Sequence, residues 1–275
     1  MRFLDRLAAG EFAVALEITP PQRHLPRVLL RRARLLGDAA HAVNVIQRPD
    51  RQSSLDASLE LRAAGLDPVW HLAARGLFRE QAVGAVERAR AGGIEQVLCI
   101  AGDHPAGEGE PSMTVREVVA LVRAGLPGAT VGATLNQYAR DPAAARRNLL
   151  PKLRAGASYV QTQPTFDVGA LEVALAGVRR EVAEVTAIAM AMPLISAEAG
   201  ERIAARLGLE LPPRLRDVLA SGDEEAAWAF FGDVLKRLVD SPAVQGVAIM
   251  TFEMDPPPAA GERIVAALEA AGALA

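Results

Sequence analysis

The stretch FAVALEITPP, residues 12–21, is the segment that decides the fold. An apolar run from Phe12 to Leu16 leads directly to the carboxyl group of Glu17, and two prolines follow at positions 20 and 21. Because proline has no N–H to donate to a sheet, a strand that begins near Phe12 must end here. A carboxylate at the end of such a strand lies either in solvent at a sheet edge or at the mouth of a closed sheet, and the other segments decide between the two.

The rest of the chain alternates short β-rich runs with longer runs of helical periodicity. The predicted strands are Ala13–Ile18, Ala42–Ile46, Pro68–Leu72, Gln96–Ile100, Thr130–Thr134, Tyr159–Gln163, Thr186–Met190 and Gly246–Thr251. The predicted helices between them are Leu25–Leu36, Leu55–Ala64, Phe78–Ala91, Val115–Ala124, Ala143–Ala155, Val168–Val182 and Ala197–Leu207. Eight strands that alternate with helices predict an α/β fold of the (β/α)8 or TIM-barrel type, since an open doubly wound sheet usually has fewer strands.

The last interval of the chain is longer than the others. Two further helical stretches, 212–221 and 224–239, precede the eighth strand, and Gly261–Ala271 forms a final helix after it. No linker, low-complexity segment or change in composition interrupts the chain. We therefore expect residues 1–275 to form a single barrel domain with extra helices before the last strand.

Composition excludes several classes of function. The formal charge is -3 and aromatic residues make up 4% of the chain, so both the basic surface and the stacking rings of a nucleic-acid-binding protein are lacking. The single cysteine, Cys99, lies in an apolar run and cannot form an intramolecular disulfide. The first residues lack a signal-peptide core, and no apolar stretch is long enough to span a membrane. We expect a cytoplasmic protein that binds neither nucleic acid nor membrane.

A barrel of this kind carries its chemistry at the C-terminal ends of its strands. The polar residues at or just after those ends are Glu17, Asn44, Gln47, His71, Asp103, Thr134, Asn136, Gln161 and Gln163. Two carboxyl groups, an imidazole and several amides can move protons and bind the edge of a heteroaromatic ring. Their spacing matches no zinc or iron site, so no metal is expected.

Five segments in order resemble one enzyme family, from about Phe12 to Ser196 and more weakly to about Leu268. They are LEITPP (16–21), WHL (70–72), GGI (92–94) leading to LCIAGDHP (98–105), AGASYVQTQPTFD (155–167) and AMPLIS (191–196). This set is similar to 5,10-methylenetetrahydrofolate reductase. The resemblance implies a flavin-dependent barrel in which NADH or NADPH reduces FAD, and FAD reduces the methylene carbon of the folate to give 5-methyltetrahydrofolate.

The resemblance also implies roles for individual residues. Glu17 matches the family's general acid, which protonates the departing nitrogen as the imidazolidine ring opens to an iminium. Its pKa must therefore be raised, as burial at a barrel mouth would do. Asp103 matches the acid between flavin and pterin, where its charge stabilises the cationic iminium. Gln163 matches the folate-binding glutamine, and Phe166 is a candidate to stack on the substrate or the nicotinamide.

The residues that the resemblance assigns to the flavin are Asn44, His71, Gly102, Asp103, Thr134, Asn148 and Lys152. Taken without the family, several of them fit a plainer role. Lys152 fits a solvated helix face, His71 a hydrogen-bonded core position, and Gly102 a tight turn. Phe166 likewise fits core packing.

The chain also departs from the family pattern. Ala101 stands where the family usually has arginine before the Gly-Asp pair, which removes a fixed donor from the flavin region. The stretch 134–140 replaces a tyrosine and a Pro-Glu-Gly-His-Pro-Glu-like segment, and 248–253 replaces a His-Phe-Tyr-Thr-Leu-Asn-like strand. These departures concern FAD and the nicotinamide more than the folate.

Three hypotheses therefore stay open from the sequence. The first is a methylenetetrahydrofolate reductase that uses FAD and NADH or NADPH. The second is a relative that keeps the folate site without flavin, and the third is a non-catalytic or partner-dependent subunit. Self-association into a homo-oligomer is compatible with each of them.

Overall fold

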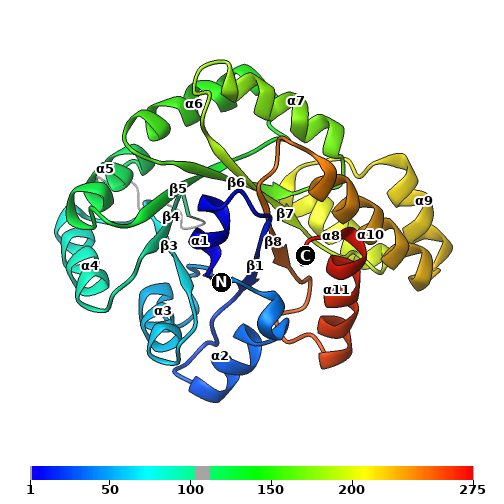
Figure 1. The fold of residues 1–275 in the computed structure, drawn as a ribbon, viewed down its shortest axis with the longest axis horizontal. Helices are drawn as coiled ribbons and strands as arrows, with labels where there is room; N and C mark the ends of the chain where they lie inside the picture. Colours follow the sequence, from blue (N-terminus) through cyan, green and yellow to red (C-terminus); the bar gives the residue numbers. More distant parts are fainter. Residues whose placement is uncertain (1, 103–111, 275) are drawn as a thin grey trace.

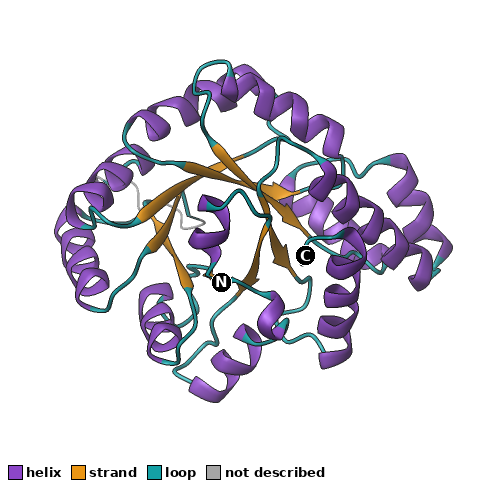
Figure 2. Ribbon diagram, viewed as in Figure 1, coloured by secondary structure: helices purple, strands orange, loops and turns teal. Residues whose placement is uncertain are grey.

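The computed structural model describes residues 2–102 and 112–274, and its centre is a closed barrel of eight parallel strands (Figures 1 and 2). The strands pair in sequence order and β8 closes on β1. They are β1 (Ala13–Ile18), β2 (Ala42–Val45), β3 (Pro68–Ala73), β4 (Gln96–Ile100), β5 (Thr130–Leu135), β6 (Tyr159–Pro164), β7 (Thr186–Ala191) and β8 (Gly246–Met250). The predicted (β/α)8 barrel is confirmed.

Helices surround the barrel on the outside, apart from α1 (Phe3–Ala8), which lies across one end of it (Figure 2). The outer helices are α2 (Pro26–Ala33), α3 (Ser54–Ala63), α4 (Arg79–Ala91), α5 (Val115–Gly125), α6 (Pro142–Arg154), α7 (Val168–Arg179), α8 (Ala197–Leu207), α9 (Pro213–Ser221), α10 (Glu224–Asp240) and α11 (Pro258–Ala271), with a short 3-10 helix η1 (Gly37–Ala39). The extra helices before the last strand are confirmed as α9 and α10. No helix within residues 2–102 and 112–274 is long and apolar enough to cross a bilayer.

Helix α1, which the sequence pattern does not predict, lies across the centre of the barrel in Figure 1. Its Phe3 is buried and packs with the side chains that fill the barrel interior. That interior combines large residues on some strands with small ones on others: Ala13, Ala15, Ala42, Val69, Leu98, Tyr159, Ile188 and Ala248. The N-terminal end of the barrel is therefore packed, and the polar residues gather at the opposite end.

Several helices begin at a polar residue that caps their first turn. The side-chain oxygen of the capping residue accepts a hydrogen bond from a backbone N–H of that turn, which satisfies one of the donors left free at a helix start. The caps are Ser53, Thr114, Asp141, Asp167, Ser196 and Asp223. Asp167, the cap of α7, lies only three residues after the last residue of β6. The start of α7 therefore leaves little room for β6 to extend further.

The insertion between β7 and β8 contributes to the barrel mouth. Helix α10 packs against α11 and α9. Within α10, the rings of Trp228 and Phe231 lie in an edge-on contact at 5.9 Å between centroids. Helix α8 ends near the C-terminal ends of the strands, where Ile203, Arg206 and Leu207 line the cavity described below. Helix α8 therefore supplies one wall of that cavity.

The packing inside the barrel depends on the lack of a side chain at Gly132. A Cβ atom at this position would lie 2.2 Å from Cζ of Tyr159, whose ring is buried. We predict that Gly132→Ala lowers the free energy of unfolding by about 1–3 kcal/mol through overpacking, measured by urea denaturation. The control is Gly128→Ala, where a Cβ would meet nothing within 4 Å. Equal stability of the two variants would contradict this account.

Candidate active site

A cavity of about 260 Å³, here called the mouth cavity, opens at the C-terminal ends of the strands. Of the residues predicted from the sequence, it brings together Glu17, Gln47, His71, Gly102, Thr134, Gln161 and Gln163. They come from β1, β3, β5, β6 and the segments after β2 and β4, as expected for the active-site end of a parallel barrel.

Glu17 is the carboxyl group of the mouth cavity. Its side chain is only 7% exposed, and it lies beside Asn44 of β2 and Met250 of β8 in the parallel register. Burial raises the pKa of Glu17 to about 7, because removing a carboxylate from water penalises its charged form. Hydrogen bonds from amide side chains and the positive charge of Arg206 oppose this shift without cancelling it. The Glu17 carboxyl group therefore holds its proton to a much higher pH than an exposed glutamate does.

Two amide side chains hold the Glu17 carboxyl group in place. Gln161 Nε2 donates to Glu17 Oε2 at 2.8 Å, and Asn44 Nδ2 donates to Gln161 Oε1 at 2.7 Å. All three side chains are buried. Because Asn44 occupies the oxygen of Gln161, the amide can present only its NH2 group to the carboxyl. Asn44, predicted to contact the flavin, is therefore part of the support of Glu17 in this structure.

His71 is buried in the wall of the mouth cavity, and its Nε2 atom has no hydrogen-bond partner among the described residues. Burial lowers the pKa of His71 to about 3, so the imidazole is neutral at physiological pH. An unpaired buried ring nitrogen is costly unless a ligand or water completes its hydrogen bond. His71 therefore offers one polar contact to a ligand in the cavity.

The segment after β4 is described as far as Gly102. Gly102 has a φ of 87°, and a Cβ there would lie 2.9 Å from Cβ of Ala73, so both the backbone and its packing require glycine. Ala101 is exposed and lines the mouth cavity with a methyl group. Asp103, predicted as a catalytic and cofactor-binding residue, lies outside the described residues, and its role stays a prediction.

The stretch 134–140, one of the departures from the family pattern, binds the end of β6. Gln137 Nε2 donates to the carbonyl oxygen of Gln163 at 2.7 Å, and the N–H of Gln163 donates to Gln137 Oε1 at 3.0 Å. The hydroxyl of Tyr138 donates to the carbonyl of Pro164 at 2.7 Å and accepts from the N–H of Phe166 at 3.2 Å. These four bonds fix the backbone on which the Gln163 side chain reaches the cavity.

Phe166 does not reach the mouth cavity. Its ring is 5% exposed and lies in the hydrophobic core, near Met192, Leu194 and Phe231. The plainer role that the sequence also allowed, core packing, is therefore the one that this structure shows. The structure does not support the predicted stacking of Phe166 on substrate or nicotinamide.

Asn148 and Lys152 both lie on α6, away from the walls of the mouth cavity. Asn148 is exposed. Lys152 is half-buried, its ammonium group has no hydrogen-bond or ion-pair partner among the described residues, and burial lowers its pKa. An ammonium group in this setting is suited to an anionic ligand, but the structure does not bring it to Glu17.

The sequence-based selection of site residues omitted two that the structure places beside Glu17. The sequence predicts Gln161 as a polar residue at the end of a strand but assigns it no catalytic or binding role. Its spacing of two residues from Gln163 puts both side chains on the inner face of β6. Arg206 lies on α8 and lines the mouth cavity. No sequence signal marks Arg206, because its position at the barrel mouth depends on how α8 packs after β7.

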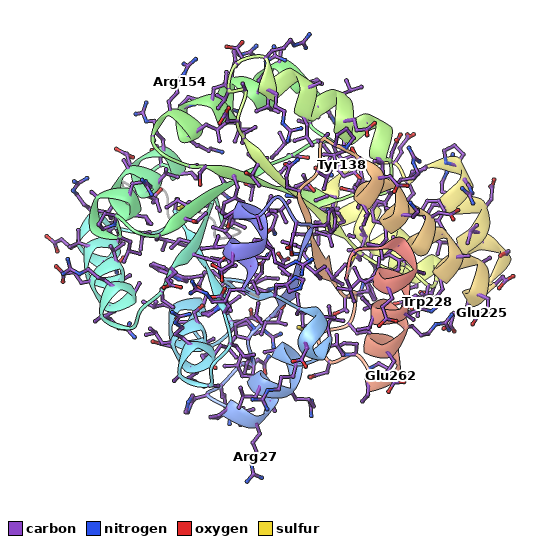
Figure 3. The ribbon with its side chains drawn as sticks, in the orientation of Figure 1. Arg27, Tyr138, Arg154, Glu225, Trp228 and Glu262 are labelled. Atoms are coloured by element: carbon purple, nitrogen blue, oxygen red, sulfur yellow. The ribbon has the colours of Figure 1, made fainter. Side chains whose placement is uncertain are left out.

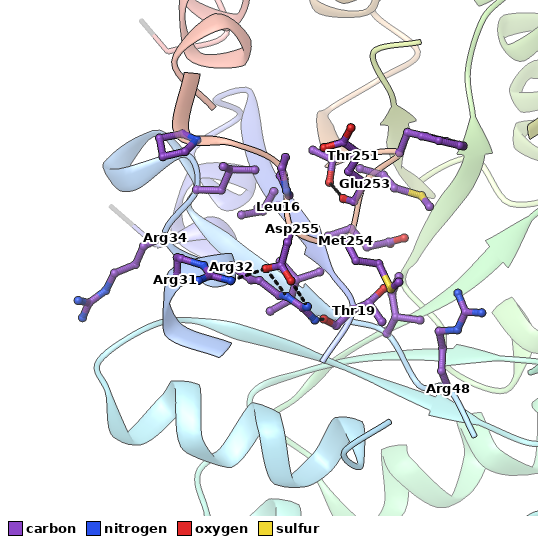
Figure 4. Close-up of a pocket in the computed structure, with 18 of the residues that line it drawn as sticks. Leu16, Thr19, Arg31, Arg32, Arg34, Arg48, Thr251, Glu253, Met254 and Asp255 are labelled. Carbon is purple, nitrogen blue, oxygen red and sulfur yellow. Dashed lines mark hydrogen bonds and ion pairs between the residues drawn. The ribbon is translucent and has the colours of Figure 1, made fainter. Parts of the chain in front are cut away.

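A second cavity of about 680 Å³, here called the outer cavity, adjoins the first (Figure 4). It lies among β1, α2, α8 and the segment from β8 to α11, and its walls share Glu17, Ile46, Arg206 and Met250 with the mouth cavity. Glu17 therefore stands between two spaces that a single elongated ligand could occupy.

A closed parallel barrel with a buried carboxyl group at the C-terminal ends of its strands defines a class, the TIM barrels with a polar site at the mouth. Comparison with family models identifies the member of that class. The model described as methylenetetrahydrofolate reductase matches residues 2–260, and the chain belongs to this family.

Among solved structures, an uncharacterized protein from Clostridium thermocellum that binds two copies of 5-methyl-5,6,7,8-tetrahydrofolic acid has the same fold. It shares 12% sequence identity with a TM-score of 0.73, and the match covers 97% of this chain and 98% of that one. The putative copper homeostasis protein CutC from Streptococcus agalactiae matches with 8% identity and a TM-score of 0.44, over 89% of this chain and 100% of that one. No curated protein sequence matches this chain.

The raised pKa of Glu17 predicts how stability changes with pH. Between its ordinary value near 4.5 and its native value of about 7, the native state binds more protons than the unfolded state, so stability falls as pH rises. Glu17→Gln removes this titration and still accepts the bond from Gln161. We expect the variant to exceed the wild type by up to about 3 kcal/mol at pH 8, with the advantage shrinking toward pH 4.

The measurement is urea denaturation across this pH range, which reports the free energy of unfolding of each variant. The control is Glu87→Gln, the same chemical change at an exposed position of α4. If the difference between Glu17→Gln and wild type does not vary with pH, Glu17 titrates near its ordinary value.

Proposed function

We propose that this protein reduces 5,10-methylenetetrahydrofolate to 5-methyltetrahydrofolate, with Glu17 as the general acid. The observation that carries the proposal is the buried carboxyl group of Glu17, which holds a proton near neutral pH at the mouth of a barrel of this family. The neighbour of the same fold that binds 5-methyl-5,6,7,8-tetrahydrofolic acid supports a reduced folate as the ligand.

The chemistry needs a proton at one nitrogen and a hydride at one carbon of the substrate. As the imidazolidine ring opens, the C–N bond to the departing nitrogen breaks, and Glu17 gives that nitrogen its proton. The electron pair of the other nitrogen forms an iminium with the methylene carbon. Hydride addition to that carbon gives the 5-methyl product, and Glu17 regains a proton from solvent before the next turnover.

The residues around Glu17 fit this role. Gln161 holds the carboxyl group in one orientation, and Asn44 holds Gln161. Gln163 lines the same cavity with its backbone fixed by Gln137, so its amide can bind the pterin edge. Arg206 opposes the rise in the pKa of Glu17, which keeps deprotonation within reach near neutral pH.

Residues at two places fit a flavin. At the mouth cavity, the unpaired Nε2 of His71 and the hydroxyl of Thr134 can contact the polar edge of a ring. On α6, Lys152 is a half-buried cation with no partner among the described residues and suits a phosphate. When bound, FAD would carry a hydride from NADH or NADPH to the methylene carbon.

A second candidate function is a folate protein of this family that works without flavin. It is favoured by the replacement at the cavity edge, where Ala101 offers no donor, and by Tyr138, whose hydroxyl is engaged with Pro164 and Phe166. Such a protein would pass hydride directly from the nicotinamide or act on another one-carbon folate.

A visible absorption spectrum separates these two functions. For the reductase we expect flavin bands in the purified protein, or after adding FAD, that bleach when NADH or NADPH is added without oxygen. Lys152→Met should weaken FAD binding by about tenfold or more, whereas Lys236→Met on α10 should not change it. A protein that binds reduced folate but takes up no FAD would select the second candidate.

Glu17→Gln tests the general acid. We expect the variant to keep reduction of bound flavin by the nicotinamide but to lose about 10²–10⁴-fold in folate reduction, because an amide has no acidic proton to donate. In the wild type, the rate of the folate step should fall as pH rises through about 7, the pKa of Glu17. Stopped-flow measurement of each half-reaction checks both expectations, with Glu87→Gln as control; unchanged folate turnover in Glu17→Gln would remove Glu17 from the mechanism.

A further inference from the structure

Glu17, Asn44 and Gln161 form a set of three buried side chains, here called the amide triangle. Gln161 Nε2 donates to Glu17 Oε2 at 2.8 Å, and Asn44 Nδ2 donates to Gln161 Oε1 at 2.7 Å. The NH2 group of Asn44 also acts on the Glu17 carboxyl and lowers its pKa, since the two residues are direct neighbours in the register of β1 and β2. Each side of the triangle is therefore occupied.

The triangle carries no charge apart from that of Glu17. Figure 3 shows several charged side chains at the outer edge of the molecule, where they are exposed: Arg27, Arg154 and Glu225. Charged or titratable side chains from the elements around Glu17 line the two cavities beside it, among them His71 of β3, Arg206 of α8, Arg32 of α2, Arg48 after β2, and Asp255 after β8. Of these, His71 is neutral, and Arg206 lowers the pKa of Glu17 by its charge.

Both amides face Glu17 with their NH2 groups, which are donors. A protonated carboxyl group is itself a donor, and the triangle offers it no acceptor, because Asn44 occupies the oxygen of Gln161. A carbonyl oxygen accepts a hydrogen bond better than the oxygen of an O–H group, so the bond from Gln161 to Oε2 favours the proton on Oε1. The O–H group of Glu17 is thereby directed away from the amides and toward the mouth cavity, which Glu17 lines.

Asn44 decides which end of the Gln161 amide faces Glu17. The last torsion of a glutamine side chain turns easily, so a Gln161 without this partner can exchange the positions of its oxygen and nitrogen. Its oxygen would then accept the proton of the neutral carboxyl group and hold that proton away from a substrate. Asn44 itself does not line the mouth cavity, so it acts on the reacting end of Glu17 through Gln161.

We propose that Asn44 is a positioning residue for the acid: by holding Gln161 as a donor, it keeps the proton of Glu17 on Oε1 and directed into the mouth cavity. This inference rests on the proposed function, because it takes Glu17 as the group that protonates the departing nitrogen. In that step the Oε1–H bond breaks as the N–H bond forms, and Glu17 becomes a carboxylate. The amide donors already face this carboxylate, so neither amide has to turn during the reaction.

Neutron diffraction from crystals of the protein alone locates the proton as a deuteron. At about pH 5, below the Glu17 pKa of about 7, we expect a wild-type deuteron on Oε1 directed into the mouth cavity. In Asn44→Leu we expect it between Glu17 and the oxygen of Gln161. A wild-type deuteron on Oε2 or shared with Gln161, or the same placement in both proteins, overturns the proposal.

Kinetics test the consequence for the reaction. At about pH 6, where wild-type Glu17 is largely protonated, Asn44→Leu should slow the single-turnover rate of folate reduction by about tenfold or more and leave the half-saturating folate concentration unchanged. The double variant Asn44→Leu/Gln161→Leu should recover most of this loss, because leucine has no oxygen to accept the proton. A merely structural role of Asn44 predicts the opposite, a double variant at least as slow as Asn44→Leu.

The matched control is Gln22→Leu, which makes the same change as Gln161→Leu at an exposed position outside both cavities and should react like the wild type. Thermal unfolding establishes that each variant is folded, and Asn44→Ala replaces Asn44→Leu if the latter does not fold. A double variant no faster than the Asn44 variant overturns the proposal. If the wild type reduces no methylenetetrahydrofolate while its deuteron lies as expected, the proposed function fails and the placement of the proton by Asn44 stands.

Discussion

The burial of one carboxyl group, that of Glu17, is the constraint on which the barrel mouth depends. A carboxylate removed from water needs either a cation beside it or a proton, and this site supplies amide donors next to it and only a more distant arginine. The pKa of Glu17 therefore rises to about 7. The side chains next to Glu17 on the inner faces of the strands must therefore be compatible with both the protonated and the ionised form of its carboxyl group.

The buried side-chain amides of Gln161 and Asn44 are compatible with both forms of Glu17, because they carry no charge that would favour one of them. Gln161 donates to whichever form of the carboxyl is present, and Asn44 prevents the Gln161 amide from turning its oxygen toward Glu17. A lysine or arginine in place of Gln161 would favour the ionised form of Glu17. The support of the acid thus comes from residues with no charge of their own, on strands far apart in the sequence.

The segments that connect the strands and helices shape the cavities at the barrel mouth. The segment after β5 uses Gln137 and Tyr138 to hold the end of β6, and α8 brings Arg206 to the cavity wall. Asp255 ties the segment after β8 to α2 through Arg31 and Arg32. Together they form two adjoining cavities, one at the strand ends and one beside it that is lined by several arginines.

The sequence by itself determined the barrel and the position of Glu17, because alternation of strands and helices and the two prolines after β1 are local patterns. The bounds of β1 and β4 matched the prediction, whereas the short helix α1 carries too little periodicity to be predicted. Only the tertiary structure decided the partners of Glu17, the core position of Phe166, and the place of Arg206. The physical reason is that burial and hydrogen bonding depend on side chains that meet across the barrel, such as Glu17 and Gln161, which are 144 residues apart along the chain.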